Sequence, residues 1–245
     1  MSSLRTRLAG HREHPQSANG QLTPAALRTP SAAGWAGILF AVLFTLAVVL
    51  IHLAAPANPN DVHGWLGNPT GRTELHVGLT LVPFCGIFFL WFMGAVRSQI
   101  GDREDKFFGT LYLGSGLLFL AMLFILAALF VGLITVTNQH SGTPPNDLWR
   151  FGRSTIYNIT NSYGLRMAAV FTISTSMIAL KLRLHHRWIT WSGFLVGILL
   201  LVTATTVPWI ELVFPAWVFA VSVNILLRTR AGATPASVAA ASAAS

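Results

Sequence analysis

The chain has 245 residues, of which 53% are hydrophobic and 10% are charged, and its mean hydropathy is +0.60. Soluble domains carry about a quarter charged residues, so this composition excludes an ordinary water-soluble protein. The net charge of +8 would suit a nucleic-acid-binding protein, but the basic residues lie in short clusters beside long apolar stretches. In such places they orient a membrane protein and contact anionic headgroups, so we expect a lipid bilayer, and no nucleic acid, as the partner.

Long stretches without Asp, Glu, Lys or Arg mark the predicted membrane spans. Three of them are free of charge, and in the stretch between Arg187 and Arg228 the only charged residue is Glu211. A helix needs about 20 apolar residues to cross about 30 Å of hydrocarbon. The sequence therefore predicts an all-α transmembrane bundle of about six helices within residues 34–228. The predicted spans cover about 35–55, 75–96, 109–136, 161–181, 188–206 and 210–227.

The last three spans need a separate argument. Arg166 and Lys181 are too close in sequence for a span to fit between them, so the fourth helix is predicted to begin near Asn161. Residues 188–227 would form a single helix about 60 Å long, twice the hydrocarbon thickness. Pro208 breaks helical hydrogen bonding, which predicts a turn there. The loop before the fourth span, 137–160, is predicted to lie along the membrane surface.

The distribution of Arg and Lys predicts that both ends of the chain lie in the cytoplasm. Twelve of the 16 basic residues fall on one side of the predicted spans and four on the other, and basic loops stay inside. Residues 1–33 are predicted to be a disordered basic cytoplasmic tail, and residues 231–245 a disordered Ala/Ser tail. The four basic residues predicted outside are Arg72, Arg150, Arg153 and Arg166.

Five ionisable residues from four spans are predicted at a similar depth in the outer leaflet. Such groups usually face the interior of a bundle and find partners there, and we expect Arg166 to pair with Glu74 or Glu211. The alternative is that all five lie among the lipid headgroups, where water satisfies them. This outer-leaflet polar cluster, with a binding or a structural role, consists of His52, Glu74, His76, Arg166 and Glu211.

A stripe of small and polar residues follows one face of the fourth span, at steps of three or four. Such a stripe is typical of a helix–helix interface, and the alternative is the lining of a polar path. The stripe consists of Asn158, Ser162, Arg166, Ala169, Thr172 and Ser176.

His52 and His76 lie on adjacent predicted antiparallel helices and could hold a haem or a transition metal, and Asp61, His63 and His140 of the outer loops could extend such a site. Their spacing matches no metal-binding pattern, so no cofactor is predicted, and metal or haem stays an alternative. The sequence contains no nucleotide-binding loop, zinc-protease motif or nucleophile elbow, which favours a protein that is not an enzyme.

The stretch Phe89–Phe124 (FLWFMGAVRSQIGDREDKFFGTLYLGSGLLFLAMLF) resembles multi-pass membrane proteins of actinobacteria. The resemblance covers the six spans and excludes both tails. It implies a bacterial plasma-membrane location and carries no activity with it. The sequence therefore favours a non-enzymatic binding or accessory component that packs with itself or with a partner subunit. A small permease or channel is the first alternative, and a haem- or metal-dependent redox protein is the second.

Overall fold

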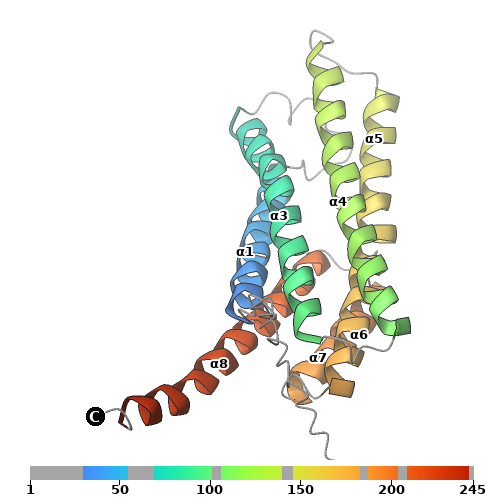
Figure 1. Cartoon of the computed structure of the whole chain (residues 1–245). Coiled ribbons are helices and arrows are strands. Elements are labelled where there is room, and N and C mark those ends of the chain that lie inside the picture. The colour runs from blue at the N-terminus through green and yellow to red at the C-terminus, as the bar shows by residue number, and fades with distance from the viewer. Residues whose placement is uncertain are drawn as a thin grey trace, which may run out of the picture.

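The computed structural model describes residues 30–54, 69–100, 106–139, 146–182, 187–203 and 209–242, which are helical apart from a turn at Trp209 (Figure 1). The elements are α1 (Pro30–Ala54), α3 (Pro69–Ile100), α4 (Lys106–Gln139), α5 (Asn146–Asn158), the π-helical segment η2 (Ile159–Gly164), α6 (Leu165–Leu182), α7 (Arg187–Thr203), the short 3₁₀ segment η3 (Ile210–Leu212) and α8 (Val213–Ser242). The predicted all-α fold is confirmed.

Five helical segments within the described residues are long and apolar enough to cross a membrane. The apolar part of α7, Trp188–Val202, is shorter than these five. The five segments are Ser31–Ala54, Thr73–Ser98, Lys106–Val136, Asp147–Lys181 and Ile210–Thr229.

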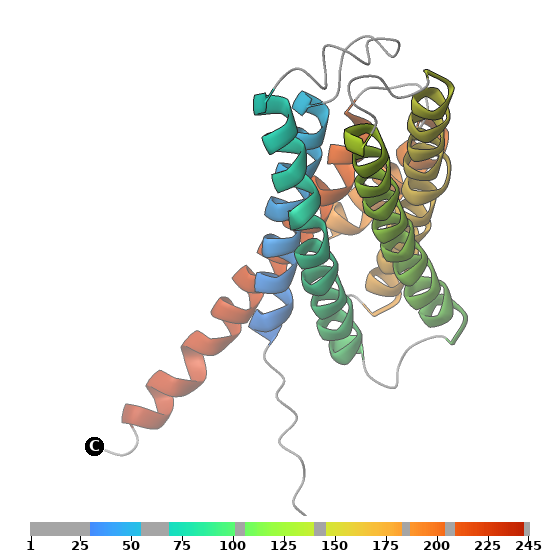
Figure 2. The same ribbon diagram turned by 90° about the horizontal axis from the view of Figure 1, so that it is seen from above.

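The helices form a bundle in which α1 packs along α3 and α8, and α6 packs along α4 and α7. Both ribbon views show α1 beside α3 in one part of the bundle and α4 beside α5 in another, while the C-terminal part of α8 extends away from the other helices (Figures 1 and 2). The order of the chain therefore builds two groups of helices. These groups meet in a common apolar core.

The fourth span begins earlier than the sequence predicts. The 13, 6 and 18 residues of α5, η2 and α6 follow one another without a break, which gives about 55 Å of helix at 1.5 Å per residue. Trp149 and Ile156 are seven residues apart on one face of α5, and both are buried in a cluster with Leu133 of α4. Residues 146–158 of the predicted surface loop instead form a helix packed beside α4, while 137–139 belong to α4 and 159–160 to η2.

Two predicted boundaries at the chain ends also differ from the structure. α1 begins at Pro30, inside the predicted tail 1–33, because proline is well tolerated in the first turn of a helix. α8 continues to Ser242, past residue 231, where a disordered Ala/Ser tail is predicted. Alanine has the highest intrinsic helix propensity, so an Ala-rich segment continues an existing helix readily. Residues 1–29 and 243–245 lie outside the described part of the chain.

Five phenylalanines, one from each of five helices, form the centre of the core. Phe89 of α3 has its ring centroid 4.8 Å from that of Phe40 in α1 and 5.2 Å from that of Phe171 in α6. Phe214 of α8 approaches Phe119 of α4 at 5.0 Å, edge to face. All five are buried, and such pairs add about 0.5–1.5 kcal/mol each beyond the area they bury. This aromatic core joins α1, α3, α4, α6 and α8.

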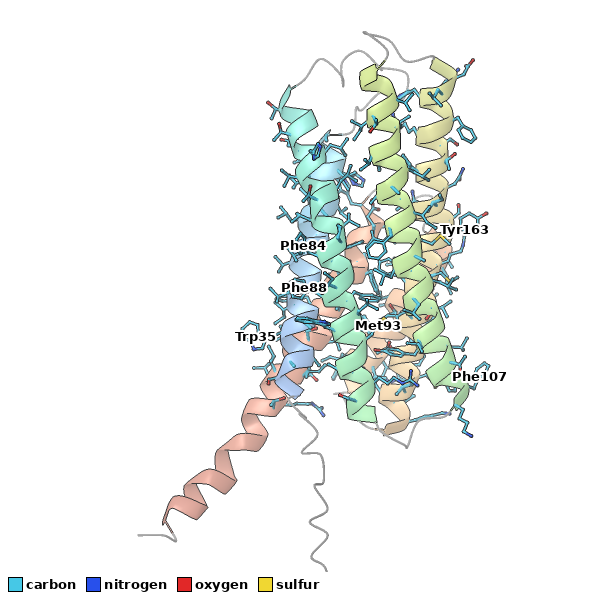
Figure 3. The ribbon with its side chains drawn as sticks, turned by 45° about the horizontal axis from the view of Figure 1, so that its top comes forward. Trp35, Phe84, Phe88, Met93, Phe107 and Tyr163 are labelled. Carbon is cyan, nitrogen blue, oxygen red and sulfur yellow. The ribbon has the colours of Figure 1, made fainter. Side chains whose placement is uncertain are left out.

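Figure 3 shows buried side chains that lie between the helices and exposed side chains that point away from the bundle. Met93 of α3 is buried and would meet a Cβ placed on Gly116 of α4. Trp35, Phe107 and Tyr163 point away from the bundle, and each is more than half exposed. The outer surface of the bundle is therefore rich in large apolar and aromatic groups.

Candidate functional site

The structure brings two of the five predicted cluster residues into direct contact. Nε2 of His52 lies 3.1 Å from Oε1 of Glu211, so an ion pair or a proton-sharing hydrogen bond joins the end of α1 to η3. Glu211 is 8% exposed, and a buried carboxylate without a partner would be destabilising by several kcal/mol. His52 therefore satisfies Glu211, and the contact connects α1 to the segment between α7 and α8.

His52 reaches Glu211 because its ring is held from its other edge. His52 lies in the last turn of α1, and its Nδ1 is 3.2 Å from the carbonyl oxygen of Val48, four residues earlier. A carbonyl oxygen has two lone pairs, so that of Val48 can accept from the imidazole as well as within the helix. The helix end thus fixes the ring so that Nε2 points toward η3.

Trp209 covers the His52 ring from the side of η3. Their ring centroids lie 4.4 Å apart with an interplanar angle of 28°, which is a stacked arrangement. Trp209 has φ 65°, in the left-handed region that an L-residue rarely adopts. A left-handed backbone costs about 1–2 kcal/mol for a residue with a Cβ, and residues held this way often mark functional sites.

The backbone conformation of Trp209 also starts η3. The carbonyl oxygen of Trp209 accepts a hydrogen bond of 3.0 Å from the N–H of Leu212. This short turn places Glu211 two residues after the stacked ring, on the side that faces His52. We call His52, Trp209 and Glu211 the His52–Glu211 site.

Glu74 and His76 do not join this site. Both lie near the start of α3, where Glu74 is half-buried and His76 is exposed. The carbonyl oxygen of His76 accepts a hydrogen bond from Oγ1 of Thr80 within the same helix. Between the residues that the structure describes, no salt bridge involves either side chain.

Arg166 takes a partner within its own helix. Its Nη1 donates a hydrogen bond to the carbonyl oxygen of Ser162, which belongs to the π-helical turn of η2. The predicted pairing of Arg166 with Glu74 or Glu211 is absent from the described residues, where Glu211 pairs with His52 instead. A π-helical turn adds a residue to one turn and therefore rotates the side chains that follow it about the helix axis. The predicted stripe assumed regular α-helical spacing, so it did not account for this rotation.

The stripe predicted on the fourth span divides at η2. Asn158 is exposed at the end of α5, and Ser162 is half-buried inside η2. Further along α6, Thr172 and Ser176 are almost fully buried, and each hydroxyl donates to the carbonyl oxygen four residues earlier. Their polar groups are therefore satisfied by the helix itself.

The buried half of this stripe faces glycines of α7. A Cβ on Gly193 would collide with Oγ of Ser176, and a Cβ on Gly197 would lie 3.2 Å from the carbonyl oxygen of Ala169. Small residues at such positions let two backbones approach closely, which is how helices associate tightly in lipid. Here the stripe lies in a helix–helix contact.

The alternative of a metal or haem at His52 and His76 has a specific geometric requirement. Both ring nitrogens of His52 already contact oxygen atoms, so ligation through either nitrogen would require one of those contacts to break. The described residues contain no group of three or more His, Cys, Asp or Glu side chains that could hold a metal ion. Asp61, His63 and His140, which could extend such a group, lie outside those residues.

Sequence reasoning grouped His52 with Glu211 by depth but missed Trp209 as part of the site. Tryptophan is common at the membrane interface, so a tryptophan at that depth does not by itself indicate a site. Its place directly after the helix-breaking Pro208, and two residues before an isolated Glu, is the signal that could have identified it.

The geometry of the site is thus a buried carboxylate, a histidine with both nitrogens engaged and a stacked indole. No protein-family model matches the chain, and comparisons with curated proteins and with solved structures found no match.

Proposed function

We propose that this chain is a bacterial plasma-membrane protein that crosses the bilayer six times and serves as a non-enzymatic binding or accessory component. Five of its helical segments are long and apolar enough to span a membrane. In this proposal α7 makes the remaining crossing. Its 17 residues are at the short end of the range that spans hydrocarbon, about 17–25 residues.

The observation that carries the membrane assignment is the distribution of side chains between the inside and the outside of the bundle. In the most apolar segment, Lys106–Val136, only 22% of an 18-residue apolar stretch is buried inside the bundle. The segment exposes large side chains such as Leu118 and Phe124. Hydroxyl groups and a carboxylate are buried instead, among them Ser115, Thr172 and Glu211. Water would oppose this arrangement, and lipid supports it.

The proposed orientation places both ends of the chain in the cytoplasm. The twelve-to-four split of Arg and Lys supports it, as basic loops are retained inside. Three exposed tryptophans lie near the proposed inner ends of α1 and α7, where aromatic belts form. They are Trp35, Trp188 and Trp191.

Reporter fusions test this topology. Fusions after residues 60, 100, 145, 185 and 230 are expected to report outside, inside, outside, inside and inside, in that order. The fusion after residue 230 separates six spans from five, because it would report outside if α7 (Arg187–Thr203) did not cross the bilayer. The proposal would be contradicted by a fusion after residue 230 that reports outside, or by neighbouring fusions among the first four that report the same compartment.

The contacts of the polar side chains near His52 support a binding or accessory role. His52 and Glu211 satisfy each other across two elements, and Arg166 bonds to its own helix. This arrangement stabilises a surface at the outer end without presenting a catalytic group.

In the native membrane, cysteine pairs introduced on the exposed face of α4 are expected to crosslink to a second copy or a partner subunit. A protein that stays monomeric under these conditions would contradict the accessory role.

A small permease or channel is the second candidate, and the π-helical segment favours it. A π-helical turn within a helix often marks a functional site, and η2 in the fourth span contains the buried residues Asn161 and Gly164. Proteoliposomes that contain a pH-sensitive or ion-sensitive dye test this candidate. Flux above that of protein-free vesicles, lost in Asn161→Leu and kept in Asn158→Leu, would support it.

A further inference from the structure

The hydrogen bonds of His52 determine how many protons the His52–Glu211 site holds. Nδ1 lies 3.2 Å from the carbonyl oxygen of Val48, and a carbonyl oxygen can only accept, so Nδ1 carries a hydrogen and donates it. Nε2 lies 3.1 Å from Oε1 of Glu211. An ionised carboxylate and a bare ring nitrogen are both acceptors, so this second contact requires one more proton between them.

We propose that the His52–Glu211 pair is a proton-binding site that holds this second proton between Nε2 and Oε1. With the proton bound, the pair is neutral, either as imidazolium with carboxylate or as imidazole with carboxylic acid. When the proton leaves to water, the carboxylate of Glu211 keeps its negative charge and faces the lone pair of Nε2. The contact between α1 and η3 then becomes repulsive and opens.

The surroundings give the carboxylate no described alternative to His52. Glu211 lies in η3, which contacts α1, α7 and α8. α7 has no charged residue between Arg187 and Thr203, and α8 has none before Arg228. Other titratable or charged side chains toward this end of the described bundle are Glu74 and His76 on α3, which packs along α1, and Arg166 on α6. On α5, which packs along α4, they are Asp147, Arg150 and Arg153. Asp61 and His63 lie outside the described residues.

The solvent exposure of the two side chains determines which of them exchanges the proton with water. The side chain of His52 is 36% exposed and that of Glu211 is 11% exposed, so water reaches the imidazole more easily than the carboxylate. Trp209 stacks on the same imidazole and belongs to the same turn as Glu211. Opening of the contact therefore changes the environment of the Trp209 indole, which serves as a built-in reporter.

This inference goes beyond the proposed function, and it depends on the site geometry alone and not on the number or direction of the spans. Its test uses the full chain in lipid nanodiscs. The fluorescence of Trp209, taken as the difference between wild type and Trp209→Phe, is followed from about pH 4 to about pH 10, which covers the carboxyl and imidazole range. We expect this difference signal to titrate in the wild type.

Glu211→Gln is the decisive variant, because the amide has nearly the same shape and carries its own N–H. The amide N–H donates to Nε2 of neutral His52 and the amide oxygen accepts from the imidazolium, so the contact persists at every pH. Because the imidazolium has lost its negatively charged partner, we expect the midpoint of the Trp209 signal to move to lower pH than in the wild type. Glu74→Gln and His76→Gln are matched controls at the same end of the bundle, and both are expected to keep the wild-type titration. A Glu211→Gln protein that titrates like wild type, or a wild type without a signal, would overturn the proposal.

A second measurement needs no variant and applies even where a substitution prevents folding. Nitrogen-15 spectra of the wild type with labelled histidine rings are recorded over the same pH range. They are expected to contain one ring whose Nδ1 stays protonated throughout while Nε2 loses its proton. If no histidine behaves in this way, the geometry of the proposed site is wrong, whatever the topology of the chain.

Discussion

Gly193 of α7 lies directly against Ser176 of α6, so closely that a Cβ on the glycine would overlap the serine Oγ. The same Cβ would lie 2.9 Å from Cζ2 of Trp217 in α8. Three helices therefore meet at one point that has room for a hydrogen but not for a methyl group. Close backbone approach of this kind replaces the hydrophobic effect as a source of association between helices in lipid.

Replacing Gly193 by alanine tests this contact. We expect Gly193→Ala to be less stable than Gly94→Ala by about 1–3 kcal/mol, the usual cost of overpacking, since a Cβ on Gly94 meets no atom within 4 Å. Both changes gain the same intrinsic helix propensity, so it cancels in the comparison. The measurement is the unfolding midpoint in mixed detergent micelles. Adding Ser176→Ala should recover part of the loss, and equal midpoints for the two single variants would contradict the close contact.

The aromatic core gives the second prediction. Phe89 is fully buried and contacts four other phenylalanine rings, whereas Phe84, five residues earlier on the same helix, is 51% exposed. Phe89→Ala is expected to destabilise the fold by about 3–5 kcal/mol, the range for large-to-small changes in a core. Phe84→Ala should change stability much less. A similar loss in both variants, measured by the same unfolding assay, would place the core elsewhere.

The backbone of Trp209 gives the third prediction, which is an order of stabilities. Trp209→Ala loses the stacking on His52 and keeps the left-handed backbone at φ 65°, which still carries a Cβ. Trp209→Gly loses the same stacking but relieves the backbone, so it should be more stable than the alanine variant by about 1 kcal/mol. Thermal unfolding of the two variants side by side measures the difference. An alanine variant that equals or exceeds the glycine variant would argue against the left-handed turn.

A hydrogen bond between α3 and α4 gives the fourth prediction. The buried hydroxyl of Tyr112 donates to the carbonyl oxygen of Met93 over 3.1 Å, and the ring stacks on Phe171. Tyr112→Phe keeps the ring and removes this donor, so we expect a loss of about 1 kcal/mol. Tyr163→Phe is the matched control, because Tyr163 is 59% exposed. The two variants should differ in chemical unfolding, and no difference would show that the hydroxyl contributes nothing to stability.

The sequence located the helices well because charge-free stretches depend only on composition and length. α3 and α4 extend beyond their predicted spans at both ends, as apolar stretches set where a helix crosses hydrocarbon and not where it stops. α5 escaped prediction because its polar outer face lowers its mean hydropathy, although Trp149 and Ile156 mark a buried face.

The candidate site was predictable in depth but not in pairing. Counting along each span placed His52 and Glu211 at a similar height, and they do meet. Which groups at one height meet depends on how each helix is rotated about its axis. The η2 turn changes that rotation ahead of Arg166, and the left-handed Trp209 changes it ahead of Glu211. Neither feature has a periodic signature in the sequence.

The unbroken length of α5, η2 and α6 has a consequence for what a cell would display. A column of about 55 Å is too long for about 30 Å of hydrocarbon, so one end must rise above the lipid. In the proposed orientation that end is α5, whose outward side chains include Asp147, Arg150 and Ser154. An antibody raised against this helix would therefore be expected to label intact cells whose outer surface is accessible, without prior permeabilisation.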